Sequence, residues 1–456
     1  MGDPSRFHSV FLEEDSCTGC TICVTTCPVE AIRVRNGKAR ILEERCIDCG
    51  ECIRRCPNRA KRALASSLVA TENFKHNIIL VPPSFYAQFD KKYSSSAIQN
   101  ALLSLGFDRL FNVSDYAFDV SFATREYLKS EKAVYPVISS SCPTVIKLIQ
   151  IRFPSLIDNI LPILPPVELA AIDARKKAVE EGFSNEQVGV FFLSPCPAKI
   201  TVPRYPLGYE SSAINGVFSI SEIYLQVISC LKTQAKPDSL SKVCKRPDFF
   251  NQAIVWGMSD GESDTLQKSV DLQKDKTQVH WLSCDGINHV LQVLEAVEEG
   301  ILNDFDFIEM SACSGGCIGG VLAVESVPVA HANLRQRVVR ENILSEQSTE
   351  TKTSSLSFDE IRKIMFDPKD CYWTQLIEPR PALLLSEDFA KARRMLSEID
   401  SILTELPALN CGACGSPNCR ALAEDIVRHR AKKEDCIHIL KRQYEQFLFG
   451  KKKSKR

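Results

Sequence analysis

The pattern of apolar and polar positions changes at about residue 75 of this 456-residue chain. From there on, short apolar runs that predict strands alternate with stretches of helical periodicity. The predicted strands are Asn77–Val81, Val134–Ile138, Val188–Leu193, Ala253–Trp256 and Phe305–Ile308. The predicted helices are Pro143–Ile151, Val167–Glu181, Ser221–Lys232 and Asn288–Glu299. Strands that alternate with helices predict an α/β core with mostly parallel sheets.

The segments on either side of this core have a different texture, so the chain as a whole is α+β. Residues 1–66 contain a repeat of about 29 residues, from Cys17 to Cys46, which indicates a duplicated small unit. Ser345–Ser357 is polar and rich in Ser and Thr, as is typical of a linker or loop. We therefore predict five segments: the duplicated unit at 1–66, a core at 75–344, a linker at 345–357, a helical connection at 358–400 and a small, mostly helical domain at 401–450. The last domain is predicted to end in one helix, Arg420–Leu448.

Composition narrows the class of protein. Hydrophobic residues make up 44% and charged residues 25% of the chain, which is ordinary for a folded domain. The net charge of −1 gives no sign of the broad positive surface that binds nucleic acid. No apolar run approaches the ~18 residues of a membrane span. The N-terminus lacks the apolar stretch of a secretory signal. Twenty cysteines without such a signal favour metal binding in a reducing, anaerobic cytoplasm over disulfides.

Two cysteine motifs near the N-terminus have the spacing of iron–sulfur ligands. Each copy reads C-x2-C-x2-C-x3-C followed by proline. In this arrangement the fourth cysteine of each run binds the other cluster. We therefore predict one 4Fe–4S cluster on Cys17, Cys20, Cys23 and Cys56, and a second on Cys46, Cys49, Cys52 and Cys27. Zinc and disulfides are the alternatives, and two full copies with proline after both make them the weaker ones.

A third motif lies near the C-terminus and reads C-x2-C-x4-C-x16-C. It consists of Cys411, Cys414, Cys419 and Cys436. Three of these thiols share a loop rich in glycine and proline, and the fourth lies on or beyond the following helix. Zinc is the alternative ligand here. The glycines allow the backbone to pack around a bulky group. Together with the other predicted clusters of the chain, they favour a 4Fe–4S cluster at this C-terminal site.

A fourth constellation is scattered through the predicted core. Cys142, Cys196 and the pair Cys313 and Cys317 each follow a predicted strand. Because ligands of open α/β sheets bind at the carboxyl ends of strands, these thiols are expected to meet in one crevice. Separate structural thiols are the alternative. The remaining cysteines lack any partner spacing and are expected to be ordinary thiols; they are Cys230, Cys244, Cys284 and Cys371.

The segments around these core cysteines resemble the three signatures of the FeFe-hydrogenases. The family reads roughly TSCCP, MPCxxK and MACPGGC, and this chain reads SSCP, SPCPAK and SACSGGC in the same order. The resemblance covers about residues 75–340, with the ferredoxin-like pair upstream. It implies a two-lobed core in which Cys142, Cys196, Cys313 and Cys317 hold a 4Fe–4S cube. It also implies that Cys317 bridges the cube to a two-iron subcluster carrying CO, cyanide and a bridging dithiolate, and that Lys199 donates to a cyanide.

The chain departs from the family pattern at positions that handle protons. The family has a proton-relaying cysteine where this chain has Ser141, and a hydroxyl is a much weaker acid than a thiol of pKa near 8.5. Thr124 and Arg125 are expected near the positions of the family's proton-path glutamates. Ser194, Ser311 and Ser314 replace two methionines and a proline of the signatures. Intact ligands with an altered proton path resemble the sensory FeFe-hydrogenases, which also carry the C-terminal cysteine motif.

This resemblance implies a slow ferredoxin hydrogenase-like enzyme that interconverts H2 with protons and electrons and is used for sensing. Its catalytic residues would be Ser141, Lys199 and Cys317. Its partners would be a ferredoxin-type electron carrier or a signalling protein, together with the maturation proteins that build the two-iron subcluster. Two alternatives stay open. One is an ordinary metabolic hydrogenase in which the serines are neutral drift, and the other is a non-catalytic, Narf-like protein without the two-iron subcluster.

Overall fold

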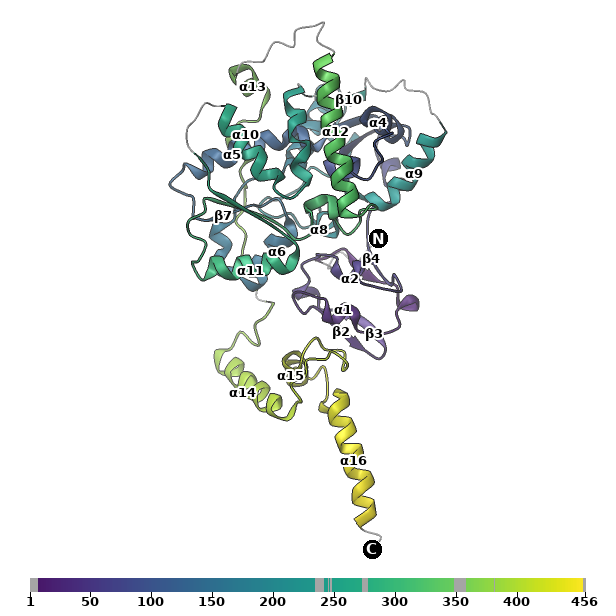
Figure 1. Ribbon diagram of the computed structural model, residues 1–456, viewed down its shortest axis with the longest axis vertical. Coiled ribbons are helices and arrows are strands. Elements are labelled where there is room, and N and C mark those ends of the chain that lie inside the picture. The colour runs from purple at the N-terminus through teal and green to yellow at the C-terminus, as the bar shows by residue number, and fades with distance from the viewer. Residues whose placement is uncertain are drawn as a thin grey trace. The chain divides into compact units, whose positions relative to one another are not determined.

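The computed structural model describes residues 7–233, 242–244, 246, 248–272, 278–347, 358–380 and 382–453. Two compact units are present, coloured along the chain in Figure 1. One unit combines Met1–Ala63 with Arg380–Arg456, and the other is Leu64–Pro379. The predicted connection at 358–400 is thus divided between the units. The predicted linker falls partly on helix α12 (Val327–Gln347), and its residues 348–357 lie outside the described ones.

The larger unit contains a five-stranded parallel sheet in the order β10-β6-β5-β8-β9. Its strands are β5 (His76–Val81), β6 (Arg109–Asn112), β8 (Val188–Ser194), β9 (Gly216–Ser219) and β10 (Val243–Cys244). Every residue of β8 is buried, as expected for a strand of a parallel sheet that helices cover. The helices packed on this sheet are α4 (Ser95–Leu103), α7 (Pro166–Glu180) and α9 (Ile220–Lys232).

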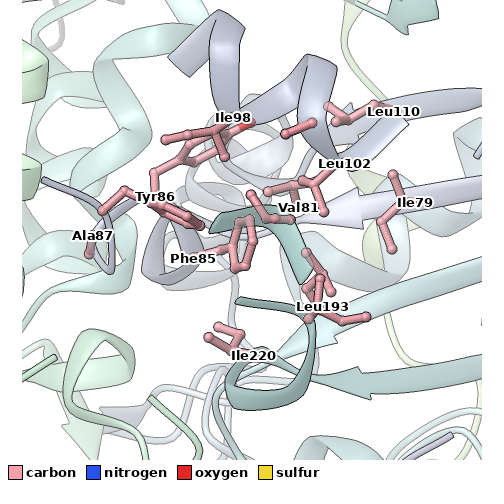
Figure 2. Packing of buried hydrophobic residues seen from close by; sticks show 14 of the residues in the cluster. Ile79, Val81, Phe85, Tyr86, Ala87, Ile98, Leu102, Leu110, Leu193 and Ile220 are labelled. Carbon is pink, nitrogen blue, oxygen red and sulfur yellow. The ribbon is translucent and has the colours of Figure 1, made fainter. Parts of the chain in front are cut away.

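The hydrophobic core of this lobe fixes where β5 and β8 end. Figure 2 shows Ile79 and Val81 of β5 close to Leu193 of β8 and to Leu102 of α4. Phe85, in the short helix α3 (Pro83–Tyr86) directly after β5, is fully buried in the same cluster. Full burial of one such side chain contributes about 1.5–3 kcal/mol, so Phe85 anchors the chain just after β5 in this core.

A second, three-stranded parallel sheet has the order β11-β12-β7. It consists of β11 (Trp281–Asp285), β12 (Phe307–Ser311) and β7 (Val137–Ile138). The helices of this lobe are α5 (Ala117–Leu128), α6 (Pro143–Arg152), α10 (Gly261–Leu272) and α11 (Ile287–Glu298). The predicted α/β core with parallel sheets is therefore confirmed, and α6, α7, α9 and α11 match the four predicted helices to within a few residues.

Two of the predicted strands are wrong, one entirely and one in part. Ala253–Trp256 was expected as a strand, but it lies in a 3₁₀ segment, Asp248–Gly257, that packs Ala253 beside α5 and Ile254 against the five-stranded sheet's core. Short apolar runs do not distinguish strand from helix, and packing on both sides decided the outcome. Val134–Ile138 forms a strand only from Val137, because Pro136 has no N–H to donate to a ladder.

The predicted final helix Arg420–Leu448 is two helices, α15 (Cys419–Val427) and α16 (Ile437–Lys453). A left-handed His429 ends α15, with φ of +57°. The amide of His429 donates to the carbonyl of Ile426, and that of Arg430 donates to the carbonyl of Asp425. This pair of bonds is the Schellman arrangement that stops a helix. Because the helix ends here, the chain turns back and Cys436 lies close to the loop that carries the other three thiols.

The smaller unit is built from two antiparallel strand pairs, β1 (Val10–Leu12) with β4 (Lys61–Ala63) and β2 (Ile32–Arg35) with β3 (Lys38–Ile41). Two one-turn helices lie between the strands, α1 (Ile22–Thr25) and α2 (Glu51–Arg54). In its C-terminal part, α14 (Phe389–Glu405) packs against α15 (Figure 1). Among the described residues of the whole chain, no helix combines the length and the apolar character needed to cross a membrane. The remaining helices are α8 (Pro197–Thr201) and α13 (Phe358–Ile364).

Candidate metal centres and active site

The N-terminal thiols lie in two groups that cross between the repeats. A small cavity is lined by the thiols of the first predicted set, Cys17, Cys20, Cys23 and Cys56. Burial, opposed by Lys61, raises the pKa of Cys23 to about 11, and the other three thiols of this set add to the rise. In the second set, burial raises the pKa of Cys49, and the nearby thiols Cys27, Cys52 and Cys46 raise it further. The structure thus groups Cys27 with the second repeat and Cys56 with the first.

The backbone around these thiols repeats as the sequence does. The amide of Ala31 donates to the sulfur of Cys27 at 3.2 Å, and the amide of Ala60 donates to the sulfur of Cys56 at the same distance. N–H donors of this kind stabilise a thiolate and tune a cluster's potential. Thiols with raised pKa values are poor free nucleophiles, because they stay protonated near neutrality. A metal would displace those protons, so the donor set fits two 4Fe–4S clusters.

The C-terminal thiols share one tight loop and the turn after α15. The loop has positive φ angles at Gly412 and Gly415, and Asn418 caps α15 by accepting a bond from the Ala421 amide at 2.7 Å. Burial raises the pKa of Cys414, and Cys436 and Cys411 lie close enough to raise it further. Cys419 and the buried Cys436 belong to the same small core. The four residues therefore fit a closed thiol site.

The core cysteines come from three strand ends in two sheets. Cys142 lies after β7 and Cys196 after β8, and each is the residue before a helix whose first position is proline. Cys313 and Cys317 follow β12. Helix N-termini favour negative charge, so both Cys–Pro steps place a sulfur where a metal-bound thiolate is stabilised.

Electrostatic coupling shows which of these thiols lie together. Burial raises the pKa of Cys196 to about 12, and the nearby thiols of Cys142 and Cys317 add to this rise. Burial also raises the pKa of Cys142, which again is close to Cys317. Cys313 lies four residues before Cys317 in the same glycine-rich loop. Three strand ends of two different sheets thus bring thiols into one crevice.

Glycines after β12 allow this loop to pack closely. Gly316 has φ of +78°, and a Cβ there would lie 2.7 Å from the carbonyl carbon of Met258. A Cβ on Gly320 would lie 2.5 Å from the carbonyl oxygen of Pro195, directly before Cys196. The amide of Leu322 donates to that same oxygen at 2.8 Å. The SGGCIGG sequence therefore lets the third signature segment lie directly on the second.

Lys199 lies on α8 with its Nζ 3.7 Å from the sulfur of Cys317. Burial lowers the pKa of Lys199, but the charges of Cys317, Cys196 and Cys142 outweigh burial and raise it overall. Lys199 therefore stays protonated beside these thiols. A cavity beside it is lined by Ser141, Cys142, Glu262, Glu309 and Cys317, with proline, Val167, Phe192 and Trp256 forming apolar walls. The cavity offers an ammonium and space next to Cys317, where an anionic metal ligand would fit.

Two buried carboxyl groups line this cavity, and the sequence patterns did not single them out. The hydroxyl of Ser139 donates to Glu262 at 2.6 Å, and Ser141 lies close enough to lower the pKa of the Glu262 carboxyl. Glu309, on β12, accepts a bond from the Ser263 amide at 2.9 Å. Burial raises the pKa of both carboxyls, and the charge of Glu262 adds to the rise at Glu309. A glutamate inside the apolar run FIEMS was the available signal for Glu309.

The positions expected to replace the family's glutamates lie elsewhere. The hydroxyl of Thr124 donates to the carbonyl of Val120 within α5, and the buried Arg125 donates to the carbonyl of Ser269 on α10. Neither is among the described residues that line the cavity. Ser194 is fully buried and bonds the backbone of Cys196, so it orders the second signature loop, whereas Ser311 does line the cavity.

Comparison with known families agrees with this arrangement. The model of the iron-only hydrogenase large subunit, C-terminal domain, matches residues 75–222 and 246–321, which include Cys142, Cys196, Cys313 and Cys317. The core of the chain belongs to this hydrogenase family. A 4Fe–4S dicluster model matches residues 9–57, and an Fe–S cluster model matches residues 406–438. Both flanking cysteine motifs therefore lie in iron–sulfur domains.

Individual relatives are distant. Iron hydrogenase 1 of Clostridium pasteurianum is 21% identical over 285 residues, covering 54% of this chain and 50% of the relative. Ferredoxin-2 of Desulfomicrobium norvegicum is 50% identical over 32 residues, covering 7% of this chain and 54% of the ferredoxin. The chain thus spans about half the length of the curated relatives it matches.

Solved structures that resemble the chain include an FeFe-hydrogenase studied for oxygen inactivation, with a TM-score of 0.48, 13% identity, and coverage of 67% of this chain and 95% of that one. Another is apo HydA1 of Chlamydomonas reinhardtii, with a TM-score of 0.44, 15% identity, and coverage of 57% and 84%.

Proposed function

We propose that this protein is a slow, H2-responsive oxidoreductase of the FeFe-hydrogenase type, used to sense H2 or redox state. The observation that carries the proposal is the crevice in which Cys142, Cys196 and Cys317 meet beside the ammonium of Lys199. An ordinary structural thiol has no need of a buried cation and a cavity next to it. Electrons would pass one at a time between this site and the flanking iron–sulfur sites.

The donor set fits a 4Fe–4S cube on Cys142, Cys196, Cys313 and Cys317. Cys317 faces the cavity and would also bridge to a two-iron subcluster with CO, cyanide and dithiolate ligands. When bound, that subcluster supplies the open iron position where H2 is split or formed. Lys199 would hold an anionic ligand of the subcluster by a charge-assisted hydrogen bond. The apolar walls exclude water and strengthen that bond.

Protons would move through residues other than those of α5. Ser141 lies near the Glu262 carboxyl, Ser139 donates to that carboxyl at 2.6 Å, and Glu309 is close enough for the charge of Glu262 to raise its pKa. A carboxyl with a raised pKa can bind and release a proton near neutrality, which a serine hydroxyl cannot do alone. Glu262 would thus carry the proton that Ser141 passes on poorly. The weak link at Ser141 would make turnover slow, which suits a sensor better than a metabolic enzyme.

The alternatives predict different spectra and rates. An ordinary metabolic hydrogenase shares the ligands but turns over fast, and a Narf-like protein holds no two-iron subcluster. The test is infrared spectroscopy of protein supplied with the matured subcluster, next to an H2 assay of the same sample. We expect CO and cyanide bands with low turnover, and a shift of the cyanide bands in Lys199→Ala. Bands with fast turnover favour the metabolic enzyme, and no bands at all favour the Narf-like protein.

A further inference from the structure

The smaller unit joins two iron–sulfur modules that are far apart in sequence. The ferredoxin module comprises residues 7–63, and the C-terminal module comprises residues 382–453. The carboxylate of Asp425 on α15 is buried and lies 2.5 Å from Nε of Arg33 and 2.8 Å from a terminal nitrogen of Arg35, both on β2. The hydroxyl of Ser416 donates to the same carboxylate at 3.0 Å. One aspartate of the C-terminal module therefore forms ion pairs with two arginines of the ferredoxin module.

A second ion pair lies beside the first. Arg45, directly before Cys46, lies 2.5 Å from the carboxylate of Glu424, and both side chains are largely buried. Asn418 donates to the carboxylate of Glu30 from the other side. Buried ion pairs are costly to break, because each partner is left as an uncompensated charge. These buried pairs therefore hold the two modules together. Exposed ion pairs on a protein surface would contribute little to such an interface.

The loop that carries Cys414 touches β2 through its backbone. The amide of Val34 donates to the carbonyl of Gly415 at 2.8 Å, and Arg35 donates to the carbonyl of Cys414 at 3.1 Å. A Cβ on Gly415 would lie only 2.1 Å from the carbonyl oxygen of Val34. Only glycine allows this approach, so the sequence of the ligand loop is adapted to the neighbouring module as well as to its own metal site.

Val34 connects the two thiol sites. It lines the cavity that also holds Cys17, Cys20, Cys23 and Cys56, while its backbone bonds Gly415 of the C-terminal loop. A single strand, β2, therefore separates the first ferredoxin cluster site from the loop of Cys414. A second contact lies beside it, since a Cβ on Gly412 would be 2.7 Å from Cγ2 of Thr25, two residues after Cys23.

We propose that the C-terminal 4Fe–4S site exchanges electrons directly with the ferredoxin cluster held by Cys17, Cys20, Cys23 and Cys56, across β2. In each transfer the donor cluster is oxidised by one electron and the acceptor cluster is reduced by one, with no bond made or broken. The Asp425 and Glu424 ion pairs hold the two sites at a constant separation. The C-terminal site is then a branch of the same electron chain, not an independent structural centre. The proposal does not depend on hydrogen chemistry in the core.

The test uses the full chain, reconstituted with iron and sulfide and reduced with dithionite. Two reduced clusters that lie close together broaden each other's electron paramagnetic resonance spectra and shorten each other's spin relaxation. We expect this coupling in the wild-type spectrum of the first ferredoxin cluster, and its loss in Cys419→Ala, which lacks the C-terminal cluster. Identical spectra and relaxation in the two proteins, with the wild type shown by iron analysis to hold the extra cluster, would overturn the proposal.

Glycine substitutions separate contact from loss of the cluster itself. Gly415→Ala keeps every thiol but drives a methyl group into Val34, so the coupling is expected to weaken with iron content unchanged. Gly37→Ala is the matched control, since Gly37 has a similar φ of +73° but nothing within 4 Å of its Cβ position. Equal weakening in both variants would contradict the proposed contact. Asp425→Asn, which keeps the shape of the side chain and removes its charge, is expected to weaken the coupling in the same way as Gly415→Ala.

Discussion

The thiol sites of the ferredoxin module and of the core are assembled in different ways. The eight ferredoxin thiols lie within one short stretch, Cys17–Cys56, and local backbone turns hold them. The core thiols extend from Cys142 to Cys317 and meet only because three strands of two sheets end at one crevice. The first kind of site depends on loops, and the second depends on the whole fold.

The two kinds of site also differ in what surrounds them. The cavity of the first ferredoxin cluster has a lysine in its lining but no carboxyl group among its described residues. The core cavity is lined by Lys199 and by the coupled pair Glu262 and Glu309. A site that passes only electrons needs no proton carrier, whereas H2 chemistry requires one at every turnover. The buried carboxyls beside the core thiols are therefore the feature that we expect of a site where protons react, and the ferredoxin cavity does not need them.

The largest effect is expected from removing the thiol that faces the core cavity. Cys317→Ala should abolish H2 oxidation and proton reduction, because this sulfur would join the cube to the two-iron subcluster. The spectra of the ferredoxin clusters should be unchanged, because their ligands lie in the other unit. Retained H2 oxidation in this variant would show that Cys317 is not the bridging ligand.

Glu262→Gln should reduce turnover by ~10²–10⁴-fold, the usual range for loss of a general acid–base group. Glutamine keeps the shape and can still accept a bond from Ser139, so infrared bands and iron content should not change. Glu295→Gln is a matched control, since Glu295 is an exposed glutamate on α11 paired with Arg152. Turnover equal to wild type would place the proton path elsewhere.

Ser141→Cys should increase turnover, with ~10²–10⁴-fold as the upper range for restoring an acid–base relay. The gain should fall below that range if Glu262 already carries much of the proton flow. Rates of H2 oxidation in matured wild-type and variant protein provide the comparison. Wild-type turnover as fast as that of metabolic hydrogenases, with no gain from cysteine, would remove the reason for proposing a sensor.

A smaller effect is expected where the second and third signature segments touch. Gly320→Ala drives a methyl group against the carbonyl oxygen of Pro195, and overpacking of this kind costs about 1–3 kcal/mol. The midpoint of thermal unfolding of the core should fall while the ferredoxin spectra persist. An unchanged or higher midpoint would mean that the loops have room to separate.

Short motifs made the grouping of the ferredoxin thiols predictable, because fixed spacing within one loop determines the geometry. The parallel core could also be predicted, since β5, β8 and β12 contain clear apolar runs. Other elements could not. The run Ala253–Trp256 has no period that separates strand from 3₁₀ helix, and the stop at His429 depends on one left-handed residue. The docking of Asp425 onto β2 joins residues almost 400 positions apart, which no local pattern encodes.

The same limit applies to Glu262. It lies in a polar stretch with no recognisable motif, and it accepts a bond from Ser139, directly after β7, only because the fold brings the start of α10 to that strand. Glutamates of a helix such as α5 can be compared by position with a family pattern. A carboxyl that lies on a different helix cannot be found by that comparison.

Iron analysis tests most directly whether the scattered core thiols form one cluster site. At four irons per cube, anaerobically reconstituted wild-type protein without the two-iron subcluster should hold about sixteen irons on its four thiol sets. The double variant Cys142→Ala with Cys196→Ala should hold about twelve, with unchanged spectra of the ferredoxin clusters. A wild-type value near eight, or equal iron in the two proteins, would contradict the assignment of the core site.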